Sequence, residues 1–463
     1  TKLLYTMFKS TIYFLLFLLS SYCIAQDLQE NGGEYIFNPD KIECLTESDR
    51  NSIVTMLQES VAALEEQGIL IASQRGSNAA FIWPVQQAAG FNYNDVWSIS
   101  NYVDHNSAYP NQLSDWNCGT RTYDTSGGYN HRGVDIFTWP FTWKQLDDDQ
   151  AEIVAGAAGQ IIAKGDGSFD RNCAFNSDTW NAVYVQHSDG SIAWYGHMKN
   201  GSLTTKNVGE TVAQGEYLGV VGSSGNSTGP HLHFEVWEDG TYTNLIDPYA
   251  GPCNPLNATT WWQTQKPYIN PNINAIMTHS APPVFPTCPT TETTNASNQF
   301  DILDTVYFAI YMRDQMSGTS VNLQIIQTND TPLFNWNFDF TNDYYASWWY
   351  WSAQLGTAGE WKWQVSYNGQ VEVHTFNVGT LSVDEEQFEA TFVYPNPVDE
   401  QLFIESNSLV TDLVITDITG KTILSLENKA SGLTQLSTSG LSSGMYFVTL
   451  RNNQNQQKIL KVI

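Results

Sequence analysis

Basic residues are scarce in this chain of 463 residues, which has 20 Lys and Arg against 48 Asp and Glu and a formal net charge of -28 at pH 7. Proteins that bind nucleic acid take most of their affinity from cations placed on phosphates, so this balance argues against a nucleic-acid partner. It also argues against tight docking on anionic lipid. We interpret the acidity as a source of solubility outside the cell.

Long hydrophobic runs are also lacking, and after the N-terminus no stretch is long enough to span a bilayer. The N-terminus itself has the pattern of a targeting segment, with a basic start at Lys9, an apolar run from Ile12 to Leu19 and a small-residue end at Ala25. We expect residues 1–25 to be upstream residues followed by a cleaved signal peptide. The mature chain is expected to have no transmembrane segment.

Cysteine is sparse, and five of the six cysteines remain after that segment is removed. No two of them lie at metal-binding spacing, which argues against a cysteine zinc site, so disulfides are the default in an oxidising compartment. Sequence does not fix the connectivity. We expect Cys118 to pair with Cys173 and Cys253 with Cys288, because each pair closes within one domain, and this leaves Cys44 unpaired.

The length of the chain predicts several domains. Apolar residues recur at helical spacing between Ser48 and Gln67, and Gly68 is a suitable stop. We interpret residues 26–80 as a pro-like segment whose helix packs against the rest of the protein, and we assign it no chemistry. From Phe81 onward short apolar runs broken by Gly, Asn and Asp predict a mainly β protein.

The C-terminal half divides at Pro-rich and charged stretches. Residues 281–299 are a predicted linker, and residues 300–380 alternate as strands do and contain a Trp cluster, which favours an immunoglobulin-like β-sandwich. We favour core packing over a sugar-binding platform as the role of these Trp residues. A charged break at residues 384–387 precedes a last β-rich unit, residues 390–463.

The central stretch, residues 81–280, reads as a small, curved antiparallel sheet. Residues 181–197 form a predicted β-hairpin around an Asp-Gly turn, and the glycines of residues 208–222 suit tight turns between short strands. A Gly/Ser-rich loop, residues 222–229, then leads into another strand.

Two short clusters in this stretch carry residues that bind metals. One is His131-Arg-Gly-Val-Asp135, and the other contains His231-Leu-His233. Side chains alternate along a strand, so His231 and His233 share one face while their apolar neighbours face a core. Two imidazoles and a carboxylate are a usual donor set for a catalytic zinc, which keeps one position open. If the two strands are neighbours, the chain is a metallohydrolase.

The two histidines of the second cluster need not both be ligands. One can bind the metal while the other serves as general base or stabilises an oxyanion, and His197 at the end of the hairpin is a candidate for a second such role. The isolated histidines are expected to be surface or hydrogen-bonded structural residues: His105, His187, His279 and His374.

Three motifs in order carry a resemblance to a known family. They are His131-x-x-x-Asp135, Tyr195-Gly-His-Met198 and Gly225-Asn-Ser-Thr-Gly-Pro-His-Leu-His-Phe-Glu235, within residues 128–248. Together they resemble the lysostaphin-type (LytM-like, beta-lytic) zinc metalloendopeptidase family. The resemblance implies a small antiparallel, barrel-sandwich-like β domain and one catalytic Zn2+.

The resemblance also implies a role for each residue. His131, Asp135 and His233 match the zinc ligands, while His197 and His231 match the histidines that assist water activation and stabilise the tetrahedral intermediate. Every expected position is present, which argues against a degenerate relative without activity.

The family's substrates are peptide bonds in peptidoglycan cross-bridges or stem peptides, and some relatives also cut Gly-rich proteins. A secreted zinc metalloendopeptidase acting on peptidoglycan of other bacteria is the predicted function. The alternatives are an extracellular endopeptidase on Gly-rich proteins and a non-catalytic module that binds cell walls. We expect a monomer.

The last unit carries a second resemblance. Tyr394-Pro-Asn-Pro397, the stretch 415–421 and Gly444-Met-Tyr-Phe447 resemble the type A sorting domain of type IX secretion cargo. The resemblance implies that this domain is a β-sandwich. The resemblance also implies that the type IX secretion machinery is a partner and that the protein is secreted or held at the cell surface, after export across the outer membrane of a Gram-negative, Bacteroidetes-type bacterium. That location favours foreign cell walls or extracellular protein as substrate.

Overall fold

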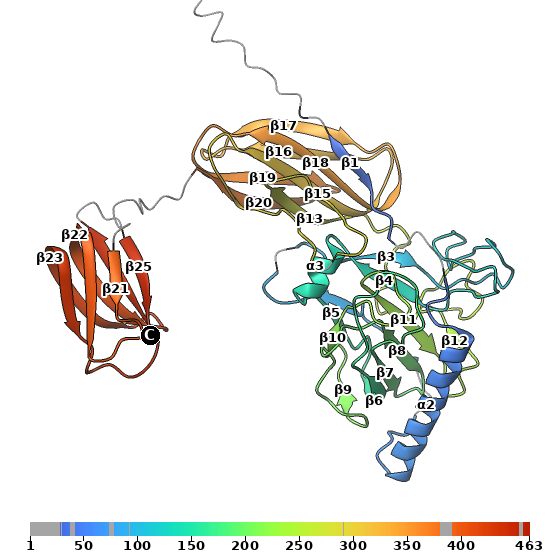
Figure 1. Ribbon diagram of the computed structural model, residues 1–463. Helices are drawn as coiled ribbons and strands as arrows, with labels where there is room; N and C mark the ends of the chain where they lie inside the picture. Colours follow the sequence, from blue (N-terminus) through green and yellow to red (C-terminus); the bar gives the residue numbers. More distant parts are fainter. Residues whose placement is uncertain are drawn as a thin grey trace, which may run out of the picture. The chain divides into compact units, whose positions relative to one another are not determined.

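The computed structural model describes residues 28, 30–37, 42–73, 78–91, 93–289, 291–379, 391–452 and 457–463. These residues form two compact units, which divide between Gly379 and Thr380 and are described separately (Figure 1). The predicted signal peptide and the charged break at residues 384–387 lie outside the described residues. Within the described ranges, no helix is long and apolar enough to cross a membrane.

Strands dominate both units, and the described residues form two α-helices, α2 (Glu47–Glu66) and α3 (Thr142–Asp147). The long helix predicted from Ser48 is confirmed as α2. It begins with a capping box in which Thr46 and Asp49 exchange hydrogen bonds, and it ends before Gly68, whose φ is +69°.

The central part of the first unit is built on an eight-stranded antiparallel sheet. Its order is β3-β4-β11-β8-β7-β6-β9, and β12 pairs with β11. The strands of this sheet are β3 (Trp97–Asn101), β4 (Val134–Thr138), β6 (Gly159–Gly165), β7 (Ala182–His187), β8 (Ile192–Gly196), β9 (Thr211–Val212), β11 (His231–Trp237) and β12 (Leu245–Ile246). The pairing of β7 with β8 confirms the predicted hairpin.

The two faces of this sheet are buried by different elements. One face packs on a three-stranded sheet through a core that includes Ile136, Leu232 and Phe234. The other face packs against α2 through a second core that includes Leu57 and Trp194. The strands of the small sheet are β2 (Val85–Gln87), β5 (Ala151–Val154) and β10 (Tyr217–Val220). The histidines of β11 lie on the α2 side, because their apolar neighbours occupy the first core.

Two further sheets of the first unit enclose one common core. A four-stranded sheet has the order β1-β18-β15-β13, and a five-stranded sheet has the order β14-β20-β19-β16-β17. The strands are β1 (Asn31–Glu34), β13 (Asn272–His279), β14 (Gln299–Phe300), β15 (Thr305–Gln315), β16 (Ser320–Ile326), β17 (Pro332–Asp339), β18 (Tyr344–Gln354), β19 (Gly359–Tyr367) and β20 (Gln370–Val378). They form a two-sheet sandwich in which Trp351, Trp361 and Trp363 are buried, as expected for core residues.

The sandwich includes strands from outside residues 300–380. β1 comes from the N-terminal segment, and β13 comes from the end of the stretch that the sequence assigns to the metallopeptidase. Residues 281–299 are tied down as well, because Arg171 donates to the Pro289 carbonyl and the Lys144 amide donates to Glu292. The sandwich and the eight-stranded part therefore form one compact unit.

The disulfides differ from the predicted pairs. Cys118 pairs with Cys253 and Cys173 with Cys288, at Cα–Cα distances of 5.1 and 5.5 Å, and Cys44 is free. The prediction was wrong because it paired cysteines near in sequence, whereas the fold brings together segments more than a hundred residues apart. The second disulfide joins the loop between β6 and β7 to the predicted linker.

The second unit has its own hydrophobic core. Its strands are β21 (Thr391–Tyr394), β22 (Gln401–Asp417), β23 (Thr422–Ser437), β24 (Tyr446–Asn452) and β25 (Gln457–Val462). Hydrogen bonds join all five into one sheet rather than the two separate sheets of the predicted sandwich. The long strand β22 carries register shifts, which bend a strand and let one sheet curl around a core.

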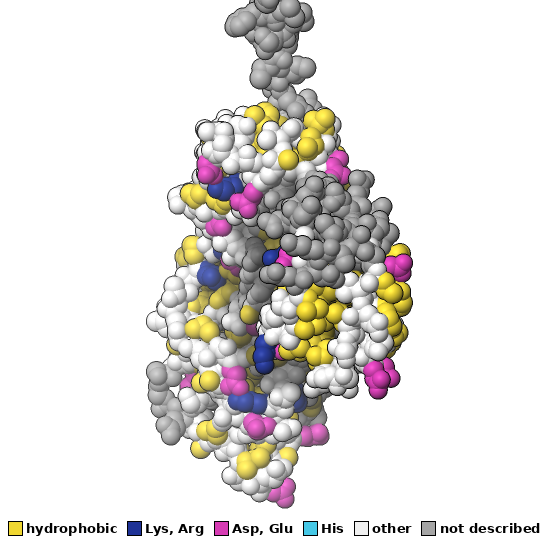
Figure 2. Space-filling model, turned by 90° about the vertical axis from the view of Figure 1, so that its left-hand side faces the viewer, with side chains coloured by type: hydrophobic (Ala, Val, Ile, Leu, Met, Phe, Trp, Pro, Cys, Tyr) yellow, Lys and Arg dark blue, Asp and Glu magenta, His cyan; other side chains and the backbone are white. Residues whose placement is uncertain are grey.

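Acidic side chains are spread singly over the face of the molecule in Figure 2 and do not gather into a patch. This distribution suits a role in solubility. Histidine is rare at the surface, since six of the eight histidines are buried: His131, His187, His197, His231, His233 and His279.

Candidate metal centre

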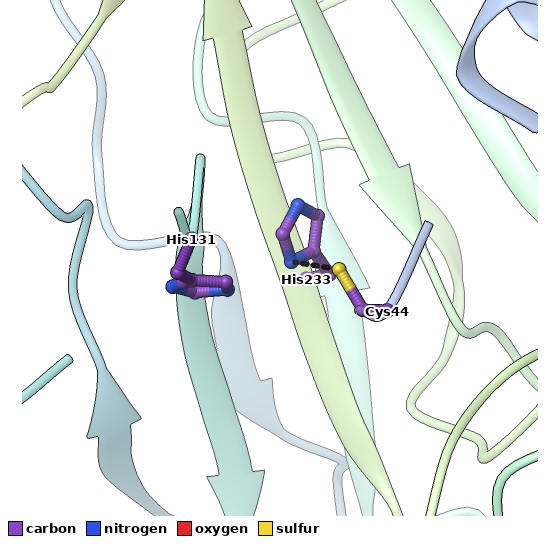
Figure 3. Close-up of side chains that lie close together, drawn as sticks. All are labelled: Cys44, His131 and His233. Carbon is purple, nitrogen blue, oxygen red and sulfur yellow. Dashed lines mark hydrogen bonds between the residues drawn. The ribbon is translucent and has the colours of Figure 1, made fainter. Parts of the chain in front are cut away.

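The metal-binding motifs meet because β4 and β11 are neighbours in the large sheet. Their register places His233 opposite Asp135, and on its other side His233 lies opposite Gly196, the last residue of β8. His131 precedes β4 and His197 follows β8, so all four histidines of the motifs converge at one end of three adjacent strands. Figure 3 shows His131 and His233 projecting toward the same space from their two elements.

His131 is completely buried and is oriented by the backbone. Its Nδ1 lies 2.8 Å from the carbonyl oxygen of Tyr102, which can only accept, so Nδ1 carries the proton. Its Nε2 has no hydrogen-bond partner and lies 3.1 Å from Oδ2 of Asp135. The free lone pair of Nε2 therefore points into the cluster.

His233 is oriented by carboxylates. Its Nε2 lies 3.1 Å from Glu235 and its Nδ1 lies 2.9 Å from Oδ1 of Asp135. Glu235 is in turn bound by Arg50 of α2 and by the indole of Trp237 at 2.7 Å. An N–H donated to Glu235 leaves Nδ1 as the nitrogen that can bind a cation. A side chain at position 133 would collide with this ring, because a Cβ there would lie 2.6 Å from His233 Nε2.

The charges around His233, Asp135 and Glu235 favour the ionised form of each side chain. Burial alone would lower the pKa of His233, but the Cys44 sulfur and the Asp135 carboxylate raise it well above its ordinary value. Burial likewise opposes ionisation of Asp135, yet the neighbouring histidines hold its pKa well below the usual range. Arg50 overcomes the effect of burial on Glu235 and lowers its pKa to about 2.

His197 and His231 form a second pair beside the first. Each donates Nδ1–H to a backbone carbonyl, His197 to Ser224 at 2.6 Å and His231 to Gly229 at 2.8 Å. Their ring centroids are 4.3 Å apart, and Nε2 of the buried His197 has no partner. Burial, with the other histidines nearby, lowers the pKa of both rings. Neutral imidazoles with free Nε2 lone pairs can accept a proton from a reacting group.

A residue that the sequence analysis left out lies in the same cluster. The sulfur of Cys44, just before α2, is 3.8 Å from Nδ1 of His233 (Figure 3). It is also 3.1 Å from the hydroxyl of Tyr129. It and one ring nitrogen each of His131 and His233 all lie within 4.8 Å of one another. The sequence argued only against a zinc site built from closely spaced cysteines, so it gave the unpaired Cys44 no place beside the histidines.

Three separations in the cluster are near those between neighbouring ligands of one zinc ion. Zinc bonds of about 2.0 Å to N and O and about 2.3 Å to S place neighbouring N or O ligands about 3.3 Å apart and S and N about 3.6 Å apart. The corresponding separations here are 3.1 Å from His131 Nε2 to Oδ2 of Asp135, 2.9 Å from His233 Nδ1 to Oδ1 of Asp135 and 3.8 Å from Cys44 Sγ to His233 Nδ1. A borderline ion such as zinc suits this mixture of nitrogen, carboxylate and sulfur donors.

The other histidines lie away from the cluster in hydrogen-bonded positions, as expected. His105 contacts Asp247 at 2.8 Å and His187 contacts the Ala158 carbonyl at 2.9 Å. His279 donates to the Thr294 carbonyl at 2.9 Å, and His374 lies 3.1 Å from the hydroxyl of Thr278.

Residues that support the cluster were also missed. Arg50 reaches Glu235 from the helix to which no chemistry was assigned, and Asn101 donates to Asp135 at 2.9 Å. Neither has a motif of its own. The one signal for Cys44 was its unpaired state in a chain expected to be secreted, which marks a free thiol as a candidate for a special role.

Comparison with protein families agrees with the two resemblances. Residues 129–245 match the family model described as peptidase family M23, and residues 392–463 match that of the secretion system C-terminal sorting domain.

Individual relatives match short parts of the chain. The peptidoglycan DD-endopeptidase ShyC of Vibrio cholerae is 37% identical over 93 residues, which are 20% of this chain and 21% of that protein. The DD-carboxypeptidase/endopeptidase Mpg of Neisseria meningitidis is 42% identical over 66 residues, 14% of each protein. The chain thus spans about a fifth or less of the length of these relatives.

Among solved structures, the catalytic domain of the antimicrobial peptidase lysostaphin from Staphylococcus simulans matches with 22% identity and a TM-score of 0.20, over 35% of this chain and 96% of that domain. The family matches cover the candidate metal centre and the second unit. Residues 129–245 of the chain are a peptidase family M23 domain, and residues 392–463 are a secretion system C-terminal sorting domain.

Proposed function

We propose that the M23 domain is a zinc endopeptidase whose single metal ion is held by His131, Asp135 and His233. One observation carries this proposal: His131 Nε2, which has no hydrogen-bond partner, and His233 Nδ1 both converge on the Asp135 carboxylate, at 3.1 and 2.9 Å, in a buried cluster. The N–H groups on the far sides of both rings are used by Tyr102 and Glu235, which fixes both nitrogens for binding.

A bound zinc ion supplies a Lewis acid that polarises a carbonyl oxygen and makes water acidic enough to react near neutral pH. The chain supplies the proton acceptors. We assign His197 and His231 to this task, since both keep Nε2 directed away from the backbone carbonyl that fixes Nδ1. The Nε2 of His231 is 3.9 Å from Asp135, which supports a role beside the proposed ligands rather than among them.

The proposed substrates are the cross-bridge or stem peptides of peptidoglycan from other bacteria. Two relatives named for peptidoglycan or DD-peptide cleavage support this class. The sorting domain supports export across the outer membrane of a Bacteroidetes-type bacterium, where the wall of another cell is reached more readily than the producer's own. Gly-rich extracellular protein is the second candidate, because the same location favours it.

The metal assignment is tested by the zinc content of purified full-length protein. His131→Ala, Asp135→Ala and His233→Ala are each expected to lose the ion, whereas His374→Ala, a half-buried histidine of the sandwich, should keep it. Full zinc occupancy in all three cluster variants would refute the assignment.

The substrate is tested by mass spectrometry of fragments released from purified peptidoglycans of several chemotypes and from a Gly-rich protein. Release of wall peptides with new amino termini supports the proposed substrate, and release from the protein alone supports the second candidate. Binding to walls without any released fragment would favour a non-catalytic binding module.

A further inference from the structure

The proposed catalytic residues are closed off from solvent. His131, His197 and His233 are 0% exposed and His231 is 5% exposed. A peptidase must admit a polypeptide to such residues, so some part of the chain has to leave before substrate can enter. The covering part is N-terminal to the M23 domain, and we call its described residues, 30–37 and 42–73, the N-terminal strap.

The first section of the strap covers His231. β1 pairs with β18 at the edge of the sandwich, and Phe37 follows it. The Phe37 ring stacks on Phe137 at 4.6 Å and meets the His231 ring edge-on at 5.6 Å. A Cβ placed on Gly229 would lie 2.9 Å from the Phe37 ring, so this ring also presses on the loop that leads into β11.

The second section places a thiol at the metal centre. Asn226 donates to the carbonyl of Glu43 at 2.6 Å, and this contact fixes the backbone beside Cys44. Cys44 is 6% exposed, and its sulfur completes a group of three potential ligand atoms with His131 and His233. A second observation points to the same ligand space: Nε2 of His131, fully buried, has no hydrogen-bond partner.

The third section is α2, which holds the thiol in place. Leu57 and Leu64 are buried in the core that α2 shares with the large sheet. Arg50 forms a buried ion pair with Glu235, and Glu47 pairs with Arg132 near the surface. These contacts are non-covalent, because the disulfides of the first unit join other segments.

We propose that the N-terminal strap keeps the enzyme latent, with the Cys44 sulfur as a fourth metal ligand in the position that the reacting water needs. The inference rests on the proposed function, because His131, Asp135 and His233 leave one tetrahedral position open. A thiol that took this position would give its proton to solvent. On activation the sulfur would take up a proton again as the strap departs and water takes its place.

The ligand role of Cys44 is tested in the full-length protein reconstituted with Co2+, by optical spectroscopy. The wild type should show the near-ultraviolet thiolate-to-cobalt charge-transfer band, and Cys44→Ser should lack it while still binding the ion. Ser48→Ala, an exposed position on the same strap, is the matched control and should keep the band. Identical spectra for the wild type and Cys44→Ser would overturn the inference.

A second readout follows the thiol directly. Alkylation of Cys44 by iodoacetamide, located by peptide mapping, should be slow in the zinc-loaded protein and faster after chelation. Equal rates in the two states would also overturn the ligand role.

Activity separates this inference from the proposed function. Cys44→Ser should hydrolyse peptide substrate at least about tenfold faster than the wild type. A tenfold change corresponds to about 1.4 kcal/mol, here the free energy by which the Cys44 sulfur competes with water for its position. Equal hydrolysis rates and equal spectra for the wild type and Cys44→Ser would refute the latent state. The proposed peptidase function would still stand. A charge-transfer band lost in Cys44→Ser, with no hydrolysis by either protein, would support the ligand role and contradict the expected gain in activity.

Discussion

Each histidine of the cluster has one nitrogen committed to a neighbour and the other directed inward. His131, His197 and His231 use backbone carbonyls for this purpose, and His233 uses Glu235. A fixed tautomer makes an imidazole a better ligand or base, because the ring needs no rotation or proton shift before it binds a metal or accepts a proton. The motif spacing supplies the residues, and these hydrogen bonds supply their chemical form.

Gly133 provides a test of how closely His233 must be held. In Gly133→Ala the new Cβ would lie 2.6 Å from the His233 ring and 2.9 Å from the Phe234 carbonyl, so the ring has to move. We expect zinc affinity to fall about 10- to 100-fold, the usual effect of disturbing a ligand's support.

The matched control is Gly165→Ala, which makes the same change in β6, where a Cβ has nothing within 4 Å. Competition with a chelator measures both affinities. Equal affinities for the two variants would contradict the tight packing around His233.

The residues of the cluster were predictable to different degrees. Asp135 and the four histidines lie in short motifs, where two-residue alternation and the resemblance identify them. Cys44 could not be found in this way, because it is 189 residues from His233 and only the fold brings the two together. The tautomers of the histidines could not be predicted either, since they depend on contacts with distant carbonyls such as that of Tyr102.

At the scale of elements, the site depends on the register of three strands. A slip of β11 by one residue against β4 would turn His231 and His233 into the first core and move Leu232 and Phe234 to the α2 side. The burial of that apolar pair therefore fixes the position of the histidines. The sequence predicted this alternation, but not that α2 would pack over the same face.

Leu57 tests how strongly α2 is docked. Its side chain is 0% exposed, so Leu57→Ala should weaken docking of the helix by about 2–5 kcal/mol. Hydrogen exchange of the α2 amides should accelerate. Met56→Ala, one position away and 37% exposed, should leave exchange nearly unchanged. Equal exchange in both variants would show that α2 does not depend on this core.

Glu292 links the predicted linker to α3 and makes stability depend on pH. It accepts a hydrogen bond from the Lys144 amide at 2.8 Å, yet burial raises its pKa from 4.5 to about 7. The folded state thus keeps the proton that the unfolded state loses. The associated stability is fully present below pH 4.5 and is lost as the pH rises to 7.

The expected loss is about 3 kcal/mol between pH 4.5 and pH 8, since each pKa unit is worth about 1.4 kcal/mol. Urea unfolding of the wild type and Glu292→Gln at both pH values measures it, because the variant lacks this titration. The same pH dependence in both proteins would contradict the raised pKa.

At the scale of the molecule, the sequence predicted the order of the parts better than their attachment. The β-rich parts follow one another as expected, but β1 and β13 join the sandwich from distant segments. The disulfides show the same limitation, because the pairing of Cys118 with Cys253 depends on how two loops meet in space. Such long-range contacts leave no periodic signal in the chain.

The two units, each with its own core, are expected to unfold in separate transitions. Cys118 and Cys253 are 135 residues apart, and a bond that closes a loop of this size stabilises by about 2–5 kcal/mol. Replacing both by Ser should therefore lower the transition of the first unit in calorimetry. The second unit, residues 380–463, contains no cysteine and serves as an internal control whose transition should stay in place. If both transitions shifted to lower temperature together, the two units would be unfolding as one body. The second unit has no cysteine, so its transition can change only if it is coupled to that of the first unit.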